Sequence, residues 1–519
     1  MVFEATPSPA DGRRHRQVTR RALLRGLGAG LTGLTLAPLV AACGGSSPTA
    51  TPAPAATTAP AATTAAQPTA AATAATGGAA ATTAPTTAGG AASPAAGATS
   101  PASGGAASPA ASAKYTPPAL SGQHSLTMLM WSHFVPAFDT YFDKYAKDWG
   151  SKNNVNVTVD HIPTNTIITR SAAEIAAGSG HDMALLENGA DVYVVAEKAN
   201  DMSPLAEYLG QQNGGWLPLA ENVGKVKGVW KGVPEFYIGF PVLYRKDLFD
   251  QAGLKPIDMW ADMDAVGKAL KPKGHQFGFA ISATGDSNST LMAYLWCYGA
   301  SWVAKDGKTI TINSPETKQA IEEMQTLYKD GMTAEVLSWD DTGNNRFLAS
   351  GVGAFILNPI SAYRSIESAN KQLFDNINIS LPPAGPKGRI MNVPARSWVN
   401  WQWSKSKDVA EKFLYDYYAQ WLDAFKASTG YNHPMLKGFE KKPMPVLGED
   451  PKLQVLQDIG AYAQTVGYPG PPTAAAGQVN NTYVIPNMFA KAVTGSTADQ
   501  AIAYAEAQIT DIYKKYPVS

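Results

Sequence analysis

One long stretch near the N-terminus cannot form a packed domain. From Gly44 to Ala113 every residue is Gly, Ala, Ser, Thr or Pro, apart from Gln67. Without charged or aromatic side chains, such a segment buries too little apolar surface to offset the entropy of ordering it. We therefore expect residues 44–115 to be a disordered tether, with a root-mean-square span of roughly 45 Å, and a folded region that starts near Tyr115.

The segment before the tether carries an export pattern. Arg20 and Arg21 are followed by three apolar residues and Arg25, which is typical of twin-arginine signals. A Gly-rich apolar stretch then ends in Val-Ala-Ala-Cys43, which resembles the lipobox of bacterial lipoproteins. We expect residues 1–43 to be a lipoprotein signal peptide, cleaved before Cys43, with lipid attached to the Cys43 thiol. The alternative is a chance arginine cluster followed by an uncleaved helix.

Charge and cysteine content exclude some classes of protein. The 519 residues include 42 basic and 42 acidic side chains, and without residues 1–43 these become 36 and 40. No basic face is indicated, which argues against a nucleic-acid partner. Beyond Cys43 the only cysteine is Cys297, so a large core rather than a disulfide must hold the fold. We expect Cys297 to be a buried apolar residue rather than a nucleophile.

The folded region begins with alternating strands and helices. Apolar periodicity predicts strands at Leu126–Trp131, around Val155–Val159 and at Asp182–Leu186, separated by a helix from Pro136 and a helix over Ile167–Ala177. This order implies parallel strands with helices packed outside them. Ligands of open α/β sheets bind beyond the carboxyl ends of strands, here at Trp131 to His133 and at Glu187 and Asn188.

The segment Val233–Leu254 is expected to carry the chain from one lobe into another. Pro234 favours extended backbone, Gly239 follows, and Phe240–Tyr244 has strand character. We expect Glu235, Phe236 and Tyr237 to be exposed at the boundary, where small ligands bind.

A second α/β set follows this crossing. It comprises helices at Trp260–Leu270, Thr290–Tyr298, Pro315–Lys329 and Ala498–Tyr513, strands at Phe277–Ile281 and Ala354–Leu357, and a strand at Trp398–Trp403 that returns the chain to the first lobe.

Several motifs resemble one known family. Tyr244-Arg-Lys-Asp-Leu-Phe249, with Ala252-Gly-Leu254, is similar to the signature of extracellular solute-binding proteins of ABC transporters, in the carbohydrate-binding group related to maltose-binding protein. Weaker blocks follow in the family order. Two departures are His181, where a proline is usual, and Met259-Trp260, with Asp258 as a possible helix cap. The resemblance implies an α/β, two-lobe, class II periplasmic-binding-protein-like fold with a hinge and an interlobe ligand cleft.

The expected lobes are each built from two stretches of chain. The N-terminal lobe would comprise residues 116–238 and about 396–448, and the C-terminal lobe residues 239–395 and about 449–519.

A sugar site needs flat aromatic rings for the sugar faces and polar side chains for the hydroxyls. Asp340, Asp341 and Arg346 are interpreted instead as an exposed helix start, and Asp182 as a structural turn carboxylate. Residues near predicted strand ends and the crossing are the candidate ligand contacts: Trp131, His133, Glu187, Asn188, Phe236, Tyr237, Asp286, Asn288, Asn358, Trp398 and Trp401.

The resemblance implies a monomeric lipoprotein that captures a carbohydrate and delivers it to an ABC importer. It would be anchored through Cys43 to the outer face of the bacterial cytoplasmic membrane, with no cofactor, metal or catalytic residue. No motif typical of hydrolytic or phosphate-binding enzymes occurs in the sequence. The alternatives are a secreted glycoside hydrolase, a surface adhesin, and a binding protein for a polyol phosphate.

Overall fold

The computed structural model of the protein describes residues 115–518. The expected signal peptide, with Arg20, Arg21 and Cys43, lies outside this range, as does the expected tether except Tyr115. The Tyr115 hydroxyl donates a hydrogen bond of 3.1 Å to the Glu411 carboxylate, so the chain is packed from its first described residue. No helix within residues 115–518 is long and apolar enough to span a bilayer.

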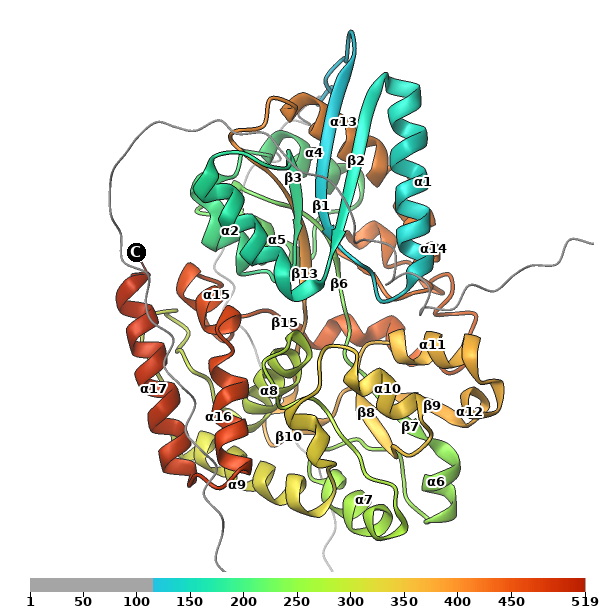
Figure 1. The fold of residues 1–519 in the computed structure, drawn as a ribbon, viewed down its shortest axis with the longest axis vertical. Coiled ribbons are helices and arrows are strands. Elements are labelled where there is room, and N and C mark those ends of the chain that lie inside the picture. The colour runs from blue at the N-terminus through green and yellow to red at the C-terminus, as the bar shows by residue number, and fades with distance from the viewer. Residues whose placement is uncertain (1–114, 519) are drawn as a thin grey trace, which may run out of the picture. The chain divides into compact units, whose positions relative to one another are not determined.

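Two β-sheets, each with its own helices, occupy separate halves of the described region (Figure 1). The larger sheet consists of β1 (His124–Trp131), β2 (Val155–Ile162), β3 (Met183–Leu186), β6 (Val233–Tyr237), β13 (Ala395–Asn400) and β14 (His433–Pro434). Its strand order is β14-β6-β13-β3-β1-β2. β1 pairs in parallel with β2 and β3, which confirms the predicted βαβαβ arrangement. β13 returns antiparallel between β3 and β6.

Aromatic side chains at helical spacing hold the helices of this first lobe on the sheet. The buried residues Phe138, Phe142 and Trp149 lie on one face of α1. The Phe142 and Phe413 rings pack edge to face with centroids 6.0 Å apart, which joins α1 to α13. The helices of this lobe are α1 (Pro136–Asn153), α2 (Ile167–Ala177), α3 (Asp191–Val195), α4 (Ser203–Gln212), α5 (Pro218–Gly224), α13 (Lys407–Tyr418) and α14 (Trp421–Ala427).

The second lobe is built on a smaller antiparallel sheet. β7 (Val242–Arg245) lies between β8 (Phe355–Leu357) and β9 (Ile377–Ser380). Its helices are α6 (Lys246–Gln251), α7 (Asp262–Leu270), α8 (Gly285–Tyr298), α9 (Pro315–Asp330), α10 (Gly343–Ala349), α11 (Ser361–Ala369), α12 (Lys371–Asn376), α16 (Val484–Val493) and α17 (Ala498–Lys515).

Three stretches of chain connect the two lobes. Residues 238–241 join β6 to β7, and residues 393–394 lead from the second lobe into β13. The third runs from β14 to Asp450, which accepts 2.7 Å from the Tyr363 hydroxyl of α11 in the second lobe.

Further along the chain, α15 (Ala474–Asn481) packs against α3 of the first lobe. The Asn481 side-chain amide donates a hydrogen bond of 2.9 Å to Asp191 in the first lobe. The Asn480 backbone carbonyl accepts a hydrogen bond of 2.9 Å from the Asn288 side chain in the second lobe. Helix α15 therefore contacts both halves.

Several local expectations are confirmed. Helix α9 begins at Pro315 as predicted, and the Ser314 hydroxyl caps it by accepting from the Thr317 N–H. Cys297 is a free, fully buried thiol. Asp182 is a structural carboxylate, because it accepts from both the backbone N–H and the hydroxyl of Thr127 at 2.8 Å.

Other local expectations are wrong. Residues 277–281 do not form a strand; Phe277 and Gly278 bridge singly to Met332 and Ile356, which belong to different segments. Asp258 is not the cap of the following helix; the Asp262 carboxylate instead accepts from the backbone N–H of Asp258 and of Met259.

Candidate functional site

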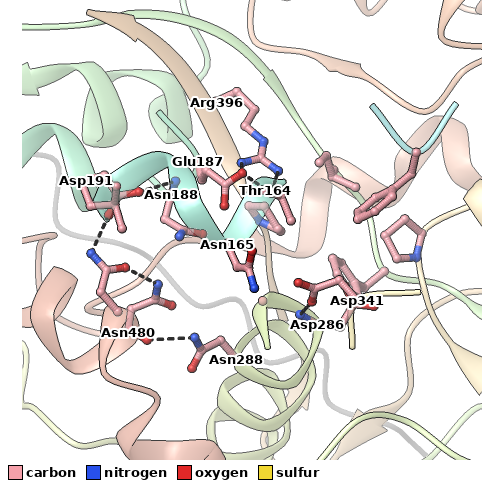
Figure 2. A pocket seen from close by; sticks show the side chains of 18 of the residues that line it. Thr164, Asn165, Glu187, Asn188, Asp191, Asp286, Asn288, Asp341, Arg396 and Asn480 are labelled. Carbon is pink, nitrogen blue, oxygen red and sulfur yellow. Dashed lines mark hydrogen bonds and ion pairs between the residues drawn. The ribbon is translucent and has the colours of Figure 1, made fainter. Parts of the chain in front are cut away.

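A cavity of about 160 Å³ lies where the lobes and their connections meet. The first lobe contributes the start of α2 and the loop after β3. The second contributes the first turn of α8 and the residue Asp341. The connections contribute Ile238, Phe240 and Pro394, strand β13 adds Arg396, and the C-terminal region adds Asn480, Asn481 and Tyr483. Figure 2 shows these side chains converging from separate elements.

A buried ion pair forms one wall of the cavity. Arg396 Nη1 lies 2.8 Å from Glu187 Oε1, and the two side chains are 4% and 13% exposed. The Thr164 hydroxyl also donates to Glu187. The Arg396 guanidinium stands 4.5 Å from the centre of the Trp131 ring, a favourable cation–π contact. Burial raises the pKa of Glu187 to about 7, although Arg396 and Thr164 lower it.

Two aspartates form a second group at the N-terminus of α8, apart from the ion pair (Figure 2). Asp341 Oδ1 accepts from the Asp286 backbone N–H at 3.0 Å, a favourable position for an anion at a helix N-terminus. The Asn344 amide donates 2.7 Å to Asp286 Oδ2. Burial raises the pKa of Asp286 well above its usual range, and the charge of Asp341 raises it further.

Amide side chains complete the polar lining. Asp191 Oδ2 accepts from the Asn188 backbone N–H at 3.0 Å, which fixes the loop after β3. The Asn288 side-chain amide donates a hydrogen bond to the Asn480 carbonyl, and its buried Oδ1 has no hydrogen bond within residues 115–518. The lining thus offers many hydrogen-bond acceptors, with Tyr431, Tyr483 and Phe134 as its aromatic rings.

The structure brings four of the eleven predicted contacts to the cavity: Glu187, Asn188, Asp286 and Asn288. All four follow a strand or begin a helix at the edge of a sheet. Helix α8 starts five residues earlier than its apolar pattern predicts, and this extension carries the last two residues. Their assignment as ligand contacts stays a prediction.

The remaining seven predicted contacts do not line the cavity, because they fill the core or contact other groups, and their assignment as ligand contacts stays a prediction. Trp398 stacks on Phe142 with ring centroids 5.8 Å apart, and Trp401 stacks on Trp403 at 5.0 Å. Phe236 packs against Phe138. Trp131 is fully buried beneath Arg396 and acts on the cavity only through it.

The other three are polar or amphipathic. His133 is 4% exposed and 3.0 Å from the Asn432 side-chain oxygen, and burial lowers the pKa of His133 to about 3. Asn358 donates to the Pro359 carbonyl at 2.9 Å. Tyr237 stacks on His433 and lines a different, more open hollow together with Glu440. Together with Glu235, which is 1% exposed, Phe236 and Tyr237 are buried rather than exposed at the lobe boundary.

Sequence reasoning missed Asp341 and Arg396. The interpretation of Asp340 and Arg346 as an exposed pair fits their 66% and 62% exposed side chains, but the neighbouring Asp341 turns inward to α8. The one signal for Arg396 is that it is the only charged residue in the predicted strand region that follows Pro394. Asn480 and Tyr483 carry no local signal, because their position depends on how α15 packs.

The side chains present can bind hydroxyl and amine groups. Within residues 115–518 no group of three or more His, Cys, Asp or Glu side chains is placed to hold a metal ion. The lining itself offers hydrogen-bonding side chains and aromatic rings, which suit a small polar solute.

Comparison with known proteins identifies the family. A model of the family described as bacterial extracellular solute-binding protein matches residues 140–445, which is more than half of the chain, and the chain belongs to this family. A lactose-binding protein of Rhizobium radiobacter is 29% identical over 203 residues, 38% of this chain and 47% of the relative. The match thus spans about half the length of this curated relative.

Solved structures show the same fold. A sugar transporter of Arthrobacter chlorophenolicus A6 with bound laminaribiose has a TM-score of 0.66 at 19% identity, covering 75% of this chain and 99% of that chain. Maltose-bound MalE3 of T. maritima has a TM-score of 0.64 at 19% identity, covering 75% and 100%. The predicted two-lobe, periplasmic-binding-protein-like α/β fold is confirmed. The family and these neighbours are binding proteins rather than enzymes.

Proposed function

We propose that the protein captures a carbohydrate between its lobes and delivers it to an ABC importer without chemical turnover. The observation that carries this proposal is the cavity itself, which takes hydrogen-bonding side chains from both lobes and from their connections. A sugar presents several hydroxyls at once, and the lining carboxylates and amides are suitable partners for them. Tyr431 and Tyr483 offer rings for the apolar faces of a sugar.

The delivery step follows from the two-lobe construction. A solute that contacts both lobes stabilises the arrangement in which they close around it. The closed form would be the one that permease subunits recognise. We further propose that the mature protein is a monomer, exported through the signal that contains Arg20 and Arg21. It would be held by lipidated Cys43 on the outer face of the cytoplasmic membrane.

Isothermal titration of the purified full-length chain with a panel of mono- and disaccharides tests the carbohydrate proposal. We expect at least one sugar to bind with a stoichiometry of one and to be recovered unchanged after long incubation. Glu187→Gln should weaken that binding, because it breaks a buried ion pair at the cavity wall. A panel without binding contradicts the carbohydrate proposal, and release of cleaved sugar favours the glycoside hydrolase.

A further inference from the structure

The charge of the cavity lining is unbalanced. Of the described residues that line it, four are acidic, namely Glu187, Asp191, Asp286 and Asp341, and Arg396 alone is basic. Arg396 is paired with Glu187, and its buried Nε and Nη1 have no hydrogen-bond partner within residues 115–518. Asp191 is satisfied by neutral donors, the backbone N–H of Asn188 and the amide of Asn481.

The other two carboxylates lack a counter-ion. Neither Asp286 nor Asp341 forms an ion pair within residues 115–518, and the nearby cation Arg346 is paired with Asp340 outside the cavity. Each carboxylate uses one oxygen in a hydrogen bond, through Asp341 Oδ1 and Asp286 Oδ2. Asp286 Oδ1 and Asp341 Oδ2 have no hydrogen bond in this range, so one oxygen of each acid is available. An unpaired charge in a buried site is costly.

An independent observation on the same helix turn also indicates a missing donor. Asn288 lines the cavity and is 3% exposed, and its side-chain oxygen has no hydrogen-bond partner within residues 115–518. A buried acceptor without a partner is rare in folded proteins. The Asn288 oxygen is enclosed and its amide is turned toward Asn480, so the oxygens open to a bound solute at this helix start are those of Asp286 and Asp341.

We propose that the bound solute is an amino sugar with a free amine, whose ammonium group is held by Asp286 and Asp341. This inference rests on the proposed carbohydrate function and narrows it. An ammonium group brings hydrogen-bond donors and one positive charge, which suit the two aspartates and supply the counter-ion that they lack. The two carboxylates also disfavour sugar phosphates and uronic acids, because like charges across a binding site oppose association. Described residues also lack a metal-binding cluster, so the expected cation is organic.

Matched ligands test the proposal. Calorimetry of the full-length chain near neutral pH compares each neutral sugar with its free-amine and N-acetylated forms, using glucose, galactose and mannose as parents. Glucose 6-phosphate, glucuronic acid and spermidine complete the panel. We expect at least one free-amine sugar to bind about tenfold or more tighter than both its neutral parent and its N-acetyl form, since hydrogen bonds between charged groups are the strong ones.

Variants assign the preference to the aspartates. Asp286→Asn and Asp341→Asn should each reduce the free-amine preference at least about tenfold while leaving the neutral parent less affected. Asp340→Asn is the matched control, because it removes the adjacent acidic charge, which is exposed and outside the cavity. Asp341 also accepts from the α8 N-terminus, so thermal melting monitors folding, and Asp286→Asn serves as the second variant without that role.

The outcomes separate this inference from the proposed function. Neutral parents that bind as tightly as their amines overturn the inference and leave the carbohydrate function standing. A free-amine preference that survives in both aspartate variants overturns the assignment to this pair. Binding of spermidine with no binding of any sugar overturns the carbohydrate function and this inference together.

Discussion

Glu235 is a buried acid that lies on β6 and does not line the cavity. It is 1% exposed, and its Oε1 accepts a hydrogen bond of 2.7 Å from the Tyr417 hydroxyl. Burial raises the pKa of Glu235 from 4.5 to about 7, while the Tyr417 hydrogen bond lowers it. The neutral form of this side chain is therefore favoured in the folded protein, and the unfolded chain loses the proton at lower pH.

This pKa shift predicts how stability depends on pH. Between pH 4.5 and about 7 the folded state binds more protons at Glu235 than the unfolded state, so stability falls as pH rises. At roughly 1.4 kcal/mol per pKa unit the loss reaches ~3 kcal/mol. Glu235→Gln should flatten the slope of unfolding free energy against pH, measured by urea denaturation. Some slope should remain, because the pKa of Glu187 is raised to about 7 as well.

Glu207→Gln is the control for this measurement, because Glu207 is exposed. An unchanged slope in the Glu235 variant, or an equal change in both variants, contradicts a buried, proton-binding Glu235.

At the scale of the element, the start of α8 determines part of the site. The Thr284 hydroxyl accepts from the Ser287 N–H and caps the helix. Asp286 and Asn288 lie in the first turn beyond this cap, and both line the cavity. Fraying of this turn would disturb the hydrogen bonds that join Asp286 to Asn344 and Asn288 to Asn480, and so would displace both side chains.

Thr284→Ala should therefore affect both stability and binding. Loss of a hydroxyl cap costs about 1 kcal/mol of unfolding free energy. Frayed first-turn residues should also weaken sugar binding several-fold by calorimetry. Ser314→Ala removes the equivalent cap of α9, which does not line the cavity, so it should lower stability by a similar amount and leave affinity unchanged. Equal affinity losses in the two variants would show that the α8 cap has no specific role in binding.

At the scale of the whole molecule, the proposed attachment to the membrane depends on Cys43, which lies outside the described range. Beyond Cys43, the only cysteine is Cys297, which is buried within the second lobe and forms no disulfide. Diacylation requires an accessible thiol, so the two cysteines have distinct expected roles.

Cys43→Ala in the native host should abolish incorporation of labelled fatty acid and move the protein from the membrane fraction to the soluble fraction. Cys297→Ala is the matched control and should retain both the label and the membrane fraction, with a small loss of stability from the cavity it creates. Fatty-acid labelling or membrane retention in the Cys43 variant would contradict the lipoprotein proposal.

Local patterns in the sequence predict the elements well, because each is determined by side chains close in the chain. The alternation of Val155, Val157 and Val159 and the helical spacing of Phe138 and Phe142 indicate the strand and helix that the structure contains. The strand predicted at residues 277–281 is wrong because residues far away in the chain decide the structure there. Apolar residues there fill the core without strand partners, and only the packed neighbours decide whether a ladder forms.

The sequence by itself predicts a tether over residues 44–113, and it determines that the first strands are parallel and that Glu187 and Asn188 follow a strand. The tertiary structure alone decides that Asp341 faces α8, that Arg396 pairs with Glu187, and that tryptophans such as Trp398 lie in the core. The physical reason is the distance along the chain over which each effect acts. Periodicity and turn chemistry act over a few residues, whereas a binding cavity is made by side chains hundreds of residues apart whose direction is set by packing.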